Sequence, residues 1–301
     1  MRRFILLGSL ALLAAIVAAA AAQAGDGRLS TPEALVLGIV EGVTEFLPVS
    51  STGHLAVTNE LLGLTDTPGG AEAADAYAIV IQAGAIVAVL GIYRARVANA
   101  IASVVGRGAD PEGGRNLLRG LVGGFVPAAL LGVLLLDTIK EQLFGIWPVV
   151  AAWILFGIVI LLWRWPGGSK PLEQMSLRDG LVVGGAQVLA LWPGTSRSLV
   201  TILAALAIGY TMSAAVEFAF LLGLVTLGAA TVYEAIGSGA VIVDRFGVLA
   251  QVIGFLAAFV SAAIAVKWMV AYLETRSLAI FGWYRIAIGV IVGGMALLGL
   301  V

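Results

Sequence analysis

The sequence predicts an all-α polytopic membrane protein made of two inverted-topology repeats, each a re-entrant helix hairpin followed by three transmembrane helices. Three observations predict this class. The composition is too apolar for a soluble domain, apolar runs of spanning length recur, and two further apolar stretches are interrupted near their middle. An interrupted stretch followed by three unbroken runs occurs twice along the chain, which indicates an internal repeat.

Composition sets the class of protein. Of 301 residues, 60% are apolar and only 12% are charged, and the mean hydropathy is +1.05. A soluble domain has about 45–50% apolar and roughly 25% charged residues. The net charge of -1 gives no reason to expect a nucleic-acid partner. The absence of cysteine excludes disulfides, thiolate metal sites and cysteine nucleophiles.

The first 24 residues form a separate segment. Arg2 and Arg3 precede an apolar run that ends in Ala22-Gln23-Ala24, a small-x-small cleavage pattern. This is the layout of a secretory signal peptide, but the run is also close to the ~20 residues that span a bilayer. We expect 1–24 to be a signal peptide or an N-terminal signal anchor, with residue 25 emerging outside. One membrane domain then covers 25–301.

The membrane elements follow in order. The first, 32–63, is a broken hairpin, with a Pro-containing polar break between two apolar halves that are each too short to cross alone. Three full crossings follow, then a second broken hairpin at 177–208 and three more crossings. The six full crossings are predicted at 76–93, 118–137, 143–163, 213–233, 247–271 and 279–300.

The positive charges set the orientation. If residue 25 is outside and each broken stretch enters and returns on its own side, most of the 17 Lys and Arg residues fall inside. This is the bias that the positive-inside rule requires. Among these residues are Arg94 and Arg96, which are predicted to lie in the first inner loop. Arg285, at the start of the last crossing, is also counted inside.

The same tracing gives the two repeats. Repeat one, 32–165, enters from outside, and repeat two, 177–301, enters from inside. Aligning Pro48 with Pro193 places Ser51 on Ser196. Paired broken helices in inverted repeats place the binding site where the breaks meet, near the bilayer midplane. The side chains of both breaks are therefore predicted to share one cavity.

The first break, in EGVTEFLPVSSTGHL, carries carboxylates and hydroxyls. Glu41 and Glu45 are four residues apart and so share one helix face. Two adjacent carboxylates in a low dielectric must share a proton, bind a cation or lie against a positive group. Pro48 ends the helix, and the free amides of the next helix start are a ready anion site. The residues of the turn and the helix start are Ser50, Ser51, Thr52, Gly53 and His54.

The second break, in WPGTSRSLVTI, adds a positive charge. Pro193-Gly194 interrupts the helix and Arg197 follows at the next helix start. An arginine at membrane depth is expensive and by default functional, and its planar fork matches phosphate oxygens. The two breaks together predict a site for a phosphate or pyrophosphate, with a serine as nucleophile or donor. The hydroxyl-bearing neighbours of Arg197 are Thr195, Ser196, Ser198 and Thr201.

Structural roles stay open for part of this set. Hydroxyls at a helix break also satisfy backbone groups, and this alternative applies to Thr52, Thr195 and Ser198. Glu45 and Arg197 could form an internal structural ion pair rather than a site.

These stretches resemble a known family. The two breaks match both signatures of the bacterial undecaprenyl-diphosphate phosphatases of the bacitracin-resistance type. One is Glu-x-x-x-Glu running into Pro-x-Ser-Ser-Thr-Gly-His, and the other is Pro-Gly-x-Ser-Arg-Ser-x-x-Thr. VIQAGAIVAV, EFAFLLG, VKWMVAYL and FGWYRIAIG also resemble the family, so the resemblance runs from residue 32 to the C-terminus. It departs at Leu224-Val225-Thr226, where relatives typically have a proline, and in the segment before the first hairpin.

The resemblance implies an integral membrane phosphatase that converts undecaprenyl diphosphate to undecaprenyl phosphate and inorganic phosphate. It implies two re-entrant hairpins meeting at a site open to the periplasmic side of the bacterial inner membrane. It further implies recycling of the lipid carrier for peptidoglycan and other envelope glycans, and an association with bacitracin resistance. The partners would be the lipid substrate and membrane lipid, without nucleic acid, and a homodimer stays open.

The resemblance also assigns roles by position. Ser51 matches the proposed nucleophile, Arg197 the phosphate-binding arginine, and Glu41 and Glu45 the catalytic carboxylates, with His54 as a further catalytic residue. Divalent cations, Mg²⁺ or Ca²⁺, are associated with the family, and Glu41 and Glu45 are their candidate ligands. No organic cofactor is implied. The predicted substrate-binding set is Ser50, Thr52, Gly194, Ser196, Ser198 and Thr201.

We expect Ser51 to attack the terminal phosphorus in line while Arg197 and the helix-start amides neutralise charge. Water would then hydrolyse a phosphoserine, with Glu45 or His54 moving protons. Direct attack by water, with Ser51 as a hydrogen-bond donor, is the mechanistic alternative. The functional alternatives are a polyprenyl-phosphate transporter (flippase) without hydrolysis, since inverted repeats are also the layout of secondary transporters, and an inactive scaffold in an envelope-synthesis complex.

Overall fold

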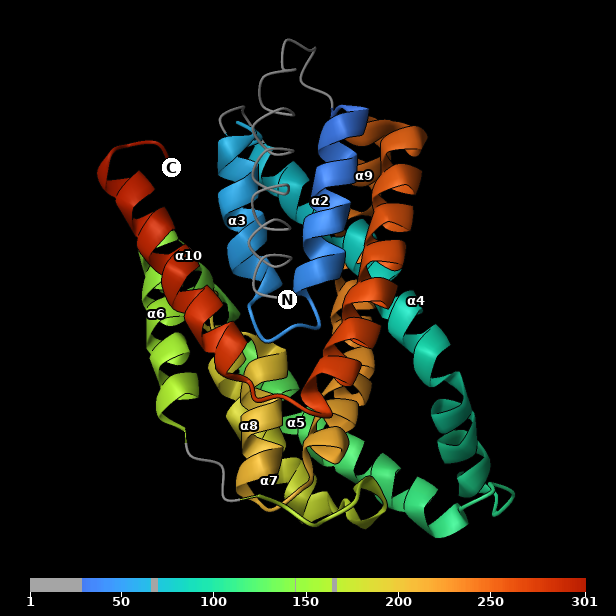
Figure 1. Cartoon of the computed structure of the whole chain (residues 1–301). Coiled ribbons are helices and arrows are strands. Elements are labelled where there is room, and N and C mark those ends of the chain that lie inside the picture. Colours follow the sequence, from blue (N-terminus) through green and yellow to red (C-terminus); the bar gives the residue numbers. More distant parts are fainter. Residues whose placement is uncertain (1–28, 66–69, 144, 164–166) are drawn as a thin grey trace.

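The chain folds as a bundle of helices in the computed structural model (Figure 1). The structure describes residues 29–65, 70–143, 145–163 and 167–301, without the side chains of short stretches within α4, α5 and α9. The predicted signal peptide or anchor at 1–24 lies outside the described residues. Within them there is no β-strand, only an isolated bridge between Lys170 and Tyr210. The elements are α2 (Thr31–Thr44), α3 (Ser51–Leu61), α4 (Gly70–Val104), α5 (Pro111–Leu143), α6 (Ile146–Leu162), η1 (Leu172–Gln174), α7 (Leu177–Gln187), η2 (Val188–Leu191), α8 (Arg197–Ala207), α9 (Met212–Leu273) and α10 (Ala279–Leu297).

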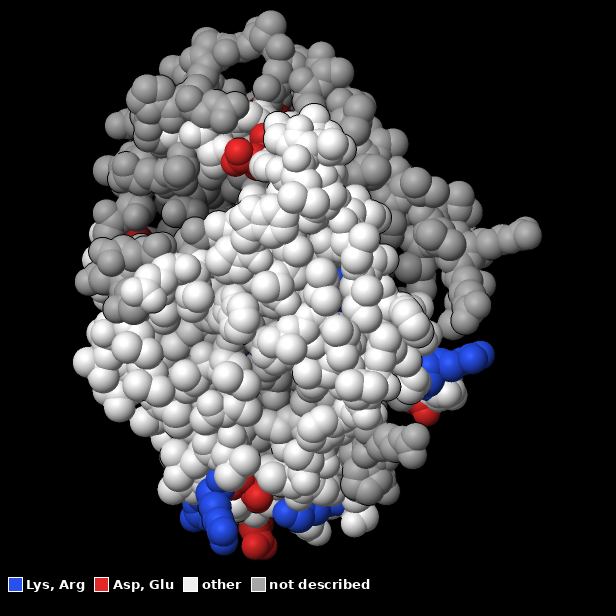
Figure 2. All heavy atoms as spheres, turned by 90° about the vertical axis from the view of Figure 1, so that its left-hand side faces the viewer, with Lys and Arg blue, Asp and Glu red and all other residues white. Residues whose placement is uncertain are grey.

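Five helical spans in the described part of the chain are long and apolar enough to cross a membrane, which makes this a multi-pass membrane protein. Figure 2 shows one face on which charged residues gather mainly at the lower end, with a small acidic group near the top and an almost uncharged zone between them. The sixth predicted crossing, 143–163, corresponds to α6, whose 17 residues are at the lower end of spanning length; its crossing stays a prediction. The five spans are Ala76–Val104, Pro111–Leu135, Met212–Ile236, Val248–Leu273 and Ala279–Leu297.

α4 is longer than the predicted crossing. It continues past a kink at Tyr93 (φ -98°, ψ 16°), so the prediction that placed Arg94 and Arg96 in a loop was wrong. Arg96 pairs there with Glu217 of α9 (2.7 Å) and with Glu173 of η1 (2.9 Å). These two carboxylates compensate a guanidinium that would otherwise lie unpaired on a largely apolar helix.

The two spans of α9 lie side by side along α4. Gln82 of α4 accepts a hydrogen bond from Thr231 in the first span (2.8 Å), and Gly84 lies against the Phe255 carbonyl of the second. A straight helix would separate Thr231 and Phe255 by about 36 Å. Because both contact the same turn of α4, the two spans run antiparallel. This arrangement confirms the separate crossings predicted at 213–233 and 247–271.

Two short helix pairs, α2 with α3 and α7 with α8, correspond to the two predicted hairpins. In Figure 1, α2 and α3 lie side by side and are joined by a loop at their lower ends. The end of the α7–α8 pair opposite the break is closed by backbone hydrogen bonds from the Lys170 amide to the Gly209 carbonyl (3.0 Å) and from the Thr211 amide to the Lys170 carbonyl (3.1 Å). The chain therefore enters and leaves this pair at the same end.

The second helix of each pair begins in the same unusual way. α3 and α8 each have 11 residues, and the serine before each lies in the left-handed region, with φ 74° and ψ 102° at Ser50 and φ 78° and ψ 111° at Ser196. Ser50 is therefore the counterpart of Ser196. The sequence alignment that paired Ser51 with Ser196 was wrong by one residue, because the two prolines stand at different distances from the helix starts.

Small residues let the hairpin helices approach the long helices closely. Gly120 and Gly124 of α5 face Gly180 and Gly184 of α7, and a Cβ built on Gly180 would overlap the Gly120 carbonyl oxygen. Gly38 of α2 meets the second span of α9 in the same manner. Such small-residue contacts replace the hydrophobic driving force that is absent between helices in lipid.

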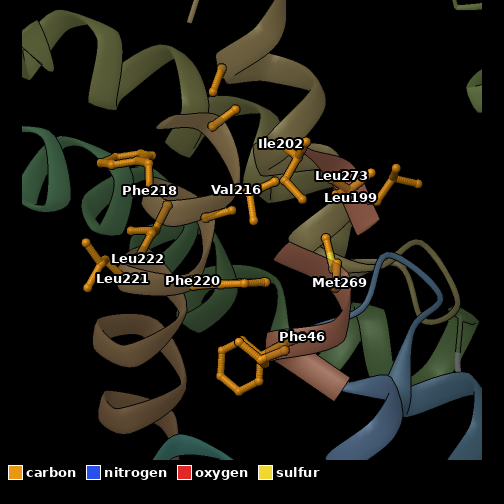
Figure 3. Close-up of a cluster of buried hydrophobic side chains, with 14 of the residues drawn as sticks. Phe46, Leu199, Ile202, Val216, Phe218, Phe220, Leu221, Leu222, Met269 and Leu273 are labelled. Carbon is orange, nitrogen blue, oxygen red and sulfur yellow. The ribbon is translucent and has the colours of Figure 1, made fainter. Parts of the chain in front are cut away.

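The main apolar core lies beside the two breaks (Figure 3). Phe46, from the first break, packs edge-on against Phe220 of α9, with ring centroids 5.6 Å apart. Leu199 of α8 and Met269 of α9 are fully buried in the same cluster. The breaks are thus fixed against packed side chains.

Candidate active site

The two breaks, Glu45–Ser50 and Trp192–Ser196, meet inside the bundle. The Ser198 hydroxyl donates to the Leu47 carbonyl (2.9 Å), and the Ser196 hydroxyl contacts the same carbonyl at 3.5 Å. The two serine oxygens are 3.0 Å apart. The start of α8 is thereby joined to the first break. The prediction from the sequence that the breaks come together is confirmed in this geometry.

Four consecutive carbonyls of the first break each accept a hydrogen bond from a side chain of a different helix. Irregular backbone within a bilayer needs such partners, since lipid offers none. The break is therefore held by α8, α10, α6 and α3 together. The pairs are Leu47 with Ser198 (2.9 Å), Pro48 with Arg285 (3.3 Å), Val49 with Trp153 (2.9 Å) and Ser50 with His54 (2.6 Å).

Arg285 joins both breaks. Its side chain is fully buried, and besides Pro48 its Nη2 donates to the carbonyls of Gly194 (2.6 Å) and Ala152 (3.2 Å). The guanidinium lies over the ring of Phe156, 5.9 Å from its centroid. The charge pattern counted Arg285 among the inner positive charges at a helix start, a count that does not anticipate its full burial. The residue lies in the first turns of α10, where backbone carbonyls compensate its burial.

Gly194 serves the second break through its backbone. It has φ +92°, and a Cβ there would lie 2.8 Å from the Val149 carbonyl oxygen of α6. A side chain is excluded on both counts. Trp192 holds the same break to α6 by donating to the Pro148 carbonyl (3.0 Å).

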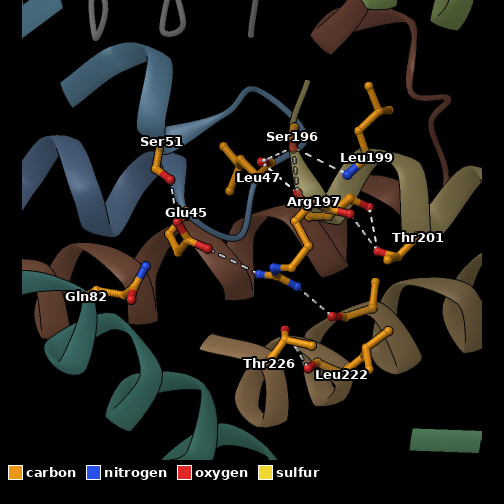
Figure 4. A network of polar contacts seen from close by, with 12 residues as sticks. Glu45, Leu47, Ser51, Gln82, Ser196, Arg197, Leu199, Thr201, Leu222 and Thr226 are labelled. Atoms are coloured by element: carbon orange, nitrogen blue, oxygen red, sulfur yellow. Dashed lines mark hydrogen bonds and ion pairs between the residues drawn. The ribbon is translucent and has the colours of Figure 1, made fainter. Parts of the chain in front are cut away.

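Glu45, Ser51 and Arg197 form the polar centre of the site (Figure 4). One carboxylate oxygen of Glu45 accepts the hydroxyl hydrogen of Ser51, and the other lies 3.3 Å from Nη2 of Arg197. Arg197 also donates to the Ala219 carbonyl of α9 (3.0 Å) and stacks on Phe46, 5.4 Å from the ring centroid. A serine hydroxyl hydrogen-bonded to a carboxylate base is the arrangement that activates an oxygen nucleophile.

Glu41 lies one turn before Glu45 and is buried at 2% exposure. Within the described part of the chain no hydrogen bond reaches its carboxylate, although it interacts electrostatically with Glu45 and Arg197. A buried carboxylate anion without a donor is unstable. Glu41 is therefore the group in the site most in need of a proton, a cation or a ligand donor.

His54 bonds groups outside this centre. Its Nδ1 bonds the Ser50 carbonyl, and its Nε2 lies 2.7 Å from the hydroxyl of Tyr284 in α10. Its ring also packs edge-on against Trp153, with centroids 4.9 Å apart. Both nitrogens are thus engaged by groups other than Ser51 and Glu45.

The remaining predicted residues differ in what they offer a ligand. The buried Thr201 hydroxyl donates to the carbonyls of Arg197 (2.9 Å) and Ser198 (3.1 Å) within its own helix. Thr52 is exposed on the first turn of α3. Like every helix start, the first turns of α3 and α8 leave backbone amides without acceptors in the helix, and these belong to residues beside Ser51 and Arg197.

Sequence reasoning missed Arg285, Tyr284, Trp153 and Gly223 as parts of the site. The signal that could have found the first two is the pair Tyr-Arg in an otherwise apolar helix, since an intramembrane arginine marks a functional region. Gly223 carries no signal of its own, because its contribution is the absence of a side chain against Arg197.

The sequence model of the family described as "Bacitracin resistance protein BacA" matches residues 34–291, a range that includes both breaks and most of α10. The chain belongs to this family. The match begins beyond the predicted signal segment at 1–24 and covers every residue of the candidate site.

Relatives in the BacA family are similar over nearly their whole length. "Undecaprenyl-diphosphatase 1" of Chromobacterium violaceum is 45% identical over 272 residues, which cover 89% of this chain and 97% of the relative. "Undecaprenyl-diphosphatase 2" of Rhodospirillum rubrum is 41% identical, with 89% of this chain and 96% of the relative covered. "Undecaprenyl-diphosphatase" of Pseudomonas syringae pv. tomato is also 41% identical, covering 86% and 92%.

Proposed function

We propose that this chain is an undecaprenyl-diphosphatase, a membrane hydrolase that releases inorganic phosphate from undecaprenyl diphosphate. Its place in the BacA family and the names of its relatives support this function. The structural observation that carries it is the Ser51 hydroxyl bonded to the Glu45 carboxylate, beside Arg197, where the two breaks meet. The transport alternative gains no support from the family or its relatives.

In the mechanism that this geometry favours, Glu45 takes the proton of the Ser51 hydroxyl as its oxygen attacks the terminal phosphorus. A bond forms between Ser51 Oγ and phosphorus, and the bond from phosphorus to the bridging oxygen breaks, so that undecaprenyl phosphate leaves. Glu45 passes that proton to the departing undecaprenyl phosphate and is again a carboxylate. Water then attacks the phosphoserine, Glu45 accepts a proton from that water and returns it to Ser51 Oγ, and the bond from Oγ to phosphorus breaks, which releases inorganic phosphate and restores the Ser51 hydroxyl. Arg197 and the helix-start amides stabilise the equatorial oxygens.

The donor set also fits a divalent cation. Glu41 and Glu45 supply carboxylate oxygens, which Mg²⁺ accepts together with waters and substrate phosphate. Both oxygens of Glu45 already have hydrogen-bond partners, whereas no hydrogen bond reaches the Glu41 carboxylate within the described residues. No cluster of three or more His, Cys, Asp and Glu side chains forms in that part of the chain. We therefore propose Glu41 as the main protein ligand, and the cation would supply added charge neutralisation for the phosphate.

We further propose that the fold is an inverted repeat with two re-entrant hairpins. Packing supports a two-fold relation: α2 packs on the second span of α9, and α7 packs on α5, its counterpart. The first crossings, α4 and the first span of α9, pack together, as do the third, α6 and α10. With the positive charges inside, the site opens to the periplasmic side of the inner membrane, where it would recycle the carrier for peptidoglycan.

Phosphate release from undecaprenyl diphosphate by purified protein in detergent tests the function. We expect release by wild type, a loss of more than about 1000-fold in Ser51→Ala, and a loss of about 100- to 1000-fold in Arg197→Ala. Ser277→Ala, at an exposed serine, and Arg276→Gln, at an exposed arginine, are matched controls that should retain full activity. Each protein is assayed with and without EDTA.

An acid quench during turnover separates the two mechanisms. Intact-mass measurement should detect a phosphoserine on wild type and none on Ser51→Ala. Substantial release by Ser51→Ala would contradict the phosphoserine route and favour direct attack by water. No release by folded wild type supplied with Mg²⁺ or Ca²⁺ would contradict the proposed function.

A further inference from the structure

We propose that Tyr284 is a positioning residue of the site, which acts through His54 to hold the backbone turn that leads into Ser51. Because it takes Ser51 as the nucleophile, this role rests on the proposed function. Tyr284 lies in α10, more than two hundred residues from His54 in the chain, and its hydroxyl is 2.7 Å from His54 Nε2.

The Ser50 carbonyl fixes the tautomer of His54. A carbonyl oxygen only accepts hydrogen bonds, so the 2.6 Å contact requires a hydrogen on His54 Nδ1. A neutral imidazole carries one N–H, which leaves Nε2 as an acceptor. Tyr284 therefore donates its hydroxyl hydrogen to Nε2. One hydrogen-bonded chain runs from the Tyr284 hydroxyl through the imidazole to the Ser50 carbonyl.

The aromatic neighbours hold the ring in this orientation. The rings of His54 and Tyr284 are nearly parallel, at 9° with centroids 5.7 Å apart. Trp153 packs edge-on at 63° from another side. Turning the imidazole over would place carbon atoms opposite both the Ser50 carbonyl and the Tyr284 hydroxyl, so both hydrogen bonds would be lost together.

Loss of the Tyr284 hydrogen bond should alter the position of Ser51, because the preceding residue, Ser50, has a strained backbone. Ser50 has φ 74° and ψ 102°, a conformation that L-residues rarely adopt and that persists only where the surroundings enforce it. His54 holds the Ser50 carbonyl, and the Ser51 amide belongs to the same peptide unit. Removal of the Tyr284 hydroxyl loosens the imidazole, then the Ser50 peptide, and finally the direction of the Ser51 hydroxyl towards Glu45.

The same geometry gives His54 a role different from proton transfer to substrate. Both of its nitrogens are engaged, one by backbone and one by Tyr284, whereas Glu45 bonds the Ser51 hydroxyl directly. The proton leaving Ser51 therefore passes to Glu45. His54 and Tyr284 act together on the placement of the nucleophile.

Selective ¹⁵N labelling tests the tautomer without reference to activity. His54 is the single histidine of the chain, so ¹⁵N-histidine in protein purified through a histidine-free tag reports this residue alone. At pH 7.5 we expect Nδ1 to appear as a protonated nitrogen with a directly bonded hydrogen, and Nε2 as an unprotonated one. A protonated Nε2, in either the other tautomer or the imidazolium, would overturn the proposal.

Tyr284→Phe then tests the coupling to Ser51. One neutral hydrogen bond changes an equilibrium by about 2- to 10-fold, so we expect kcat to fall about 3- to 10-fold with KM within about 2-fold. The Nε2 resonance of His54 should move in the same variant. Tyr77→Phe is the matched control, since Tyr77 is a buried tyrosine whose hydroxyl donates to the Ala250 carbonyl (3.0 Å) away from the breaks; neither kcat nor the resonance should change.

The outcomes separate this role from the proposed function. A Tyr284→Phe protein with wild-type kcat, or with an unmoved Nε2 resonance, would overturn the positioning role although wild type hydrolyses the substrate. Wild type that gives the expected spectrum but releases no phosphate would contradict the proposed function, while the spectrum would still support the hydrogen-bonded chain.

Discussion

The guanidinium of Arg197 lies against the bare backbone of Gly223. A Cβ built on Gly223 would overlap Arg197 Nη1 and come within 2.7 Å of its Cζ. One turn earlier on α9, the Ala219 carbonyl accepts a hydrogen bond from the same guanidinium (3.0 Å). The space that receives Arg197 is thus shaped by a missing side chain, and the direction of its charge is set by α9.

Gly223→Ala should impair the site without touching a polar group. The added methyl would displace the Arg197 guanidinium, and a displacement of about 1 Å can cost about 100-fold in rate. We expect kcat/KM for phosphate release to fall about 10- to 100-fold. Gly228→Ala is the matched control in the same helix, because nothing lies within 4 Å of its added Cβ. Equal activity of the two variants would show that Gly223 does not position Arg197.

Arg285→Gln should destabilise the whole protein as well as the site. The substitution removes donors to three backbone carbonyls, at 2.6, 3.2 and 3.3 Å. Hydrogen bonds from charged groups contribute about 1.5–3 kcal/mol each. We expect the midpoint of thermal unfolding in detergent to fall by several degrees and phosphate release to be nearly lost. Arg276→Gln, at an exposed position on the loop before α10, should leave both unchanged.

Glu41→Gln tests the cation. If Glu41 is the main protein ligand, as we propose, the Mg²⁺ concentration for half-maximal phosphate release should rise more than about 10-fold, since a neutral amide binds a divalent cation far more weakly than a carboxylate. Part of kcat should return at saturating Mg²⁺. Glu60→Gln, which neutralises an exposed carboxylate at the end of α3, is the control. An unchanged Mg²⁺ titration in Glu41→Gln would count against cation binding there.

We expect the contribution of Asp179 to the stability of the second helix pair, α7 with α8, to be lost in acid. In the first turn of α7, outside the five apolar spans, it accepts hydrogen bonds from Ser176 Oγ (2.6 Å) and the Tyr210 hydroxyl (3.0 Å). Burial alone would raise the pKa of Asp179, but these hydrogen bonds and the charge of Lys170 hold it below its usual value. The folded state therefore favours the carboxylate. Its stabilisation is complete above the unfolded pKa of about 3.9 and is lost as the pH falls through the lowered pKa.

Thermal unfolding of Asp179→Asn measures this contribution. We expect its unfolding midpoint to lie several degrees below that of wild type at pH 7, with the difference shrinking below about pH 4. Glu274→Gln, at an exposed carboxylate beyond α9, should match wild type at both pH values. A difference that persists unchanged at low pH would assign the effect to packing rather than to the carboxylate charge.

Much of the fold and of the site could be predicted from two sequence features, the long apolar runs and the two polar breaks. Lipid demands long apolar helices, so the spans of α4, α5, α9 and α10 were readable from the sequence. Paired breaks in inverted repeats meet at one site, and their polar residues then line it. The convergence of Glu45, Ser51 and Arg197 could therefore be predicted from the sequence alone. The one-residue error in the repeat register arose because the match relied on Pro48 and Pro193, whose spacing to the helix starts differs.

Arg285 and Tyr284 could not be placed by the same reasoning. Their main partners are backbone carbonyls and a histidine more than two hundred residues away, and a backbone carbonyl leaves no mark on residue identity. Arg285 was interpreted as one more positive charge at a helix start. Counting charges does not distinguish an arginine at the membrane boundary from one buried in the bundle. Only the packing of α10 against α6 and both breaks distinguishes it.

The first break depends on donors from four helices, and the latest of these donors in the chain, Arg285, lies in α10. A nascent chain that has completed α8 already contains every residue of the two signature motifs, yet the carbonyls of Pro48 and Gly194 still lack the guanidinium that joins them. Assembly of the site therefore waits for insertion of α10. We expect a chain truncated before α10 to carry both signature motifs and yet remain inert, because the residue that joins the two breaks would be missing.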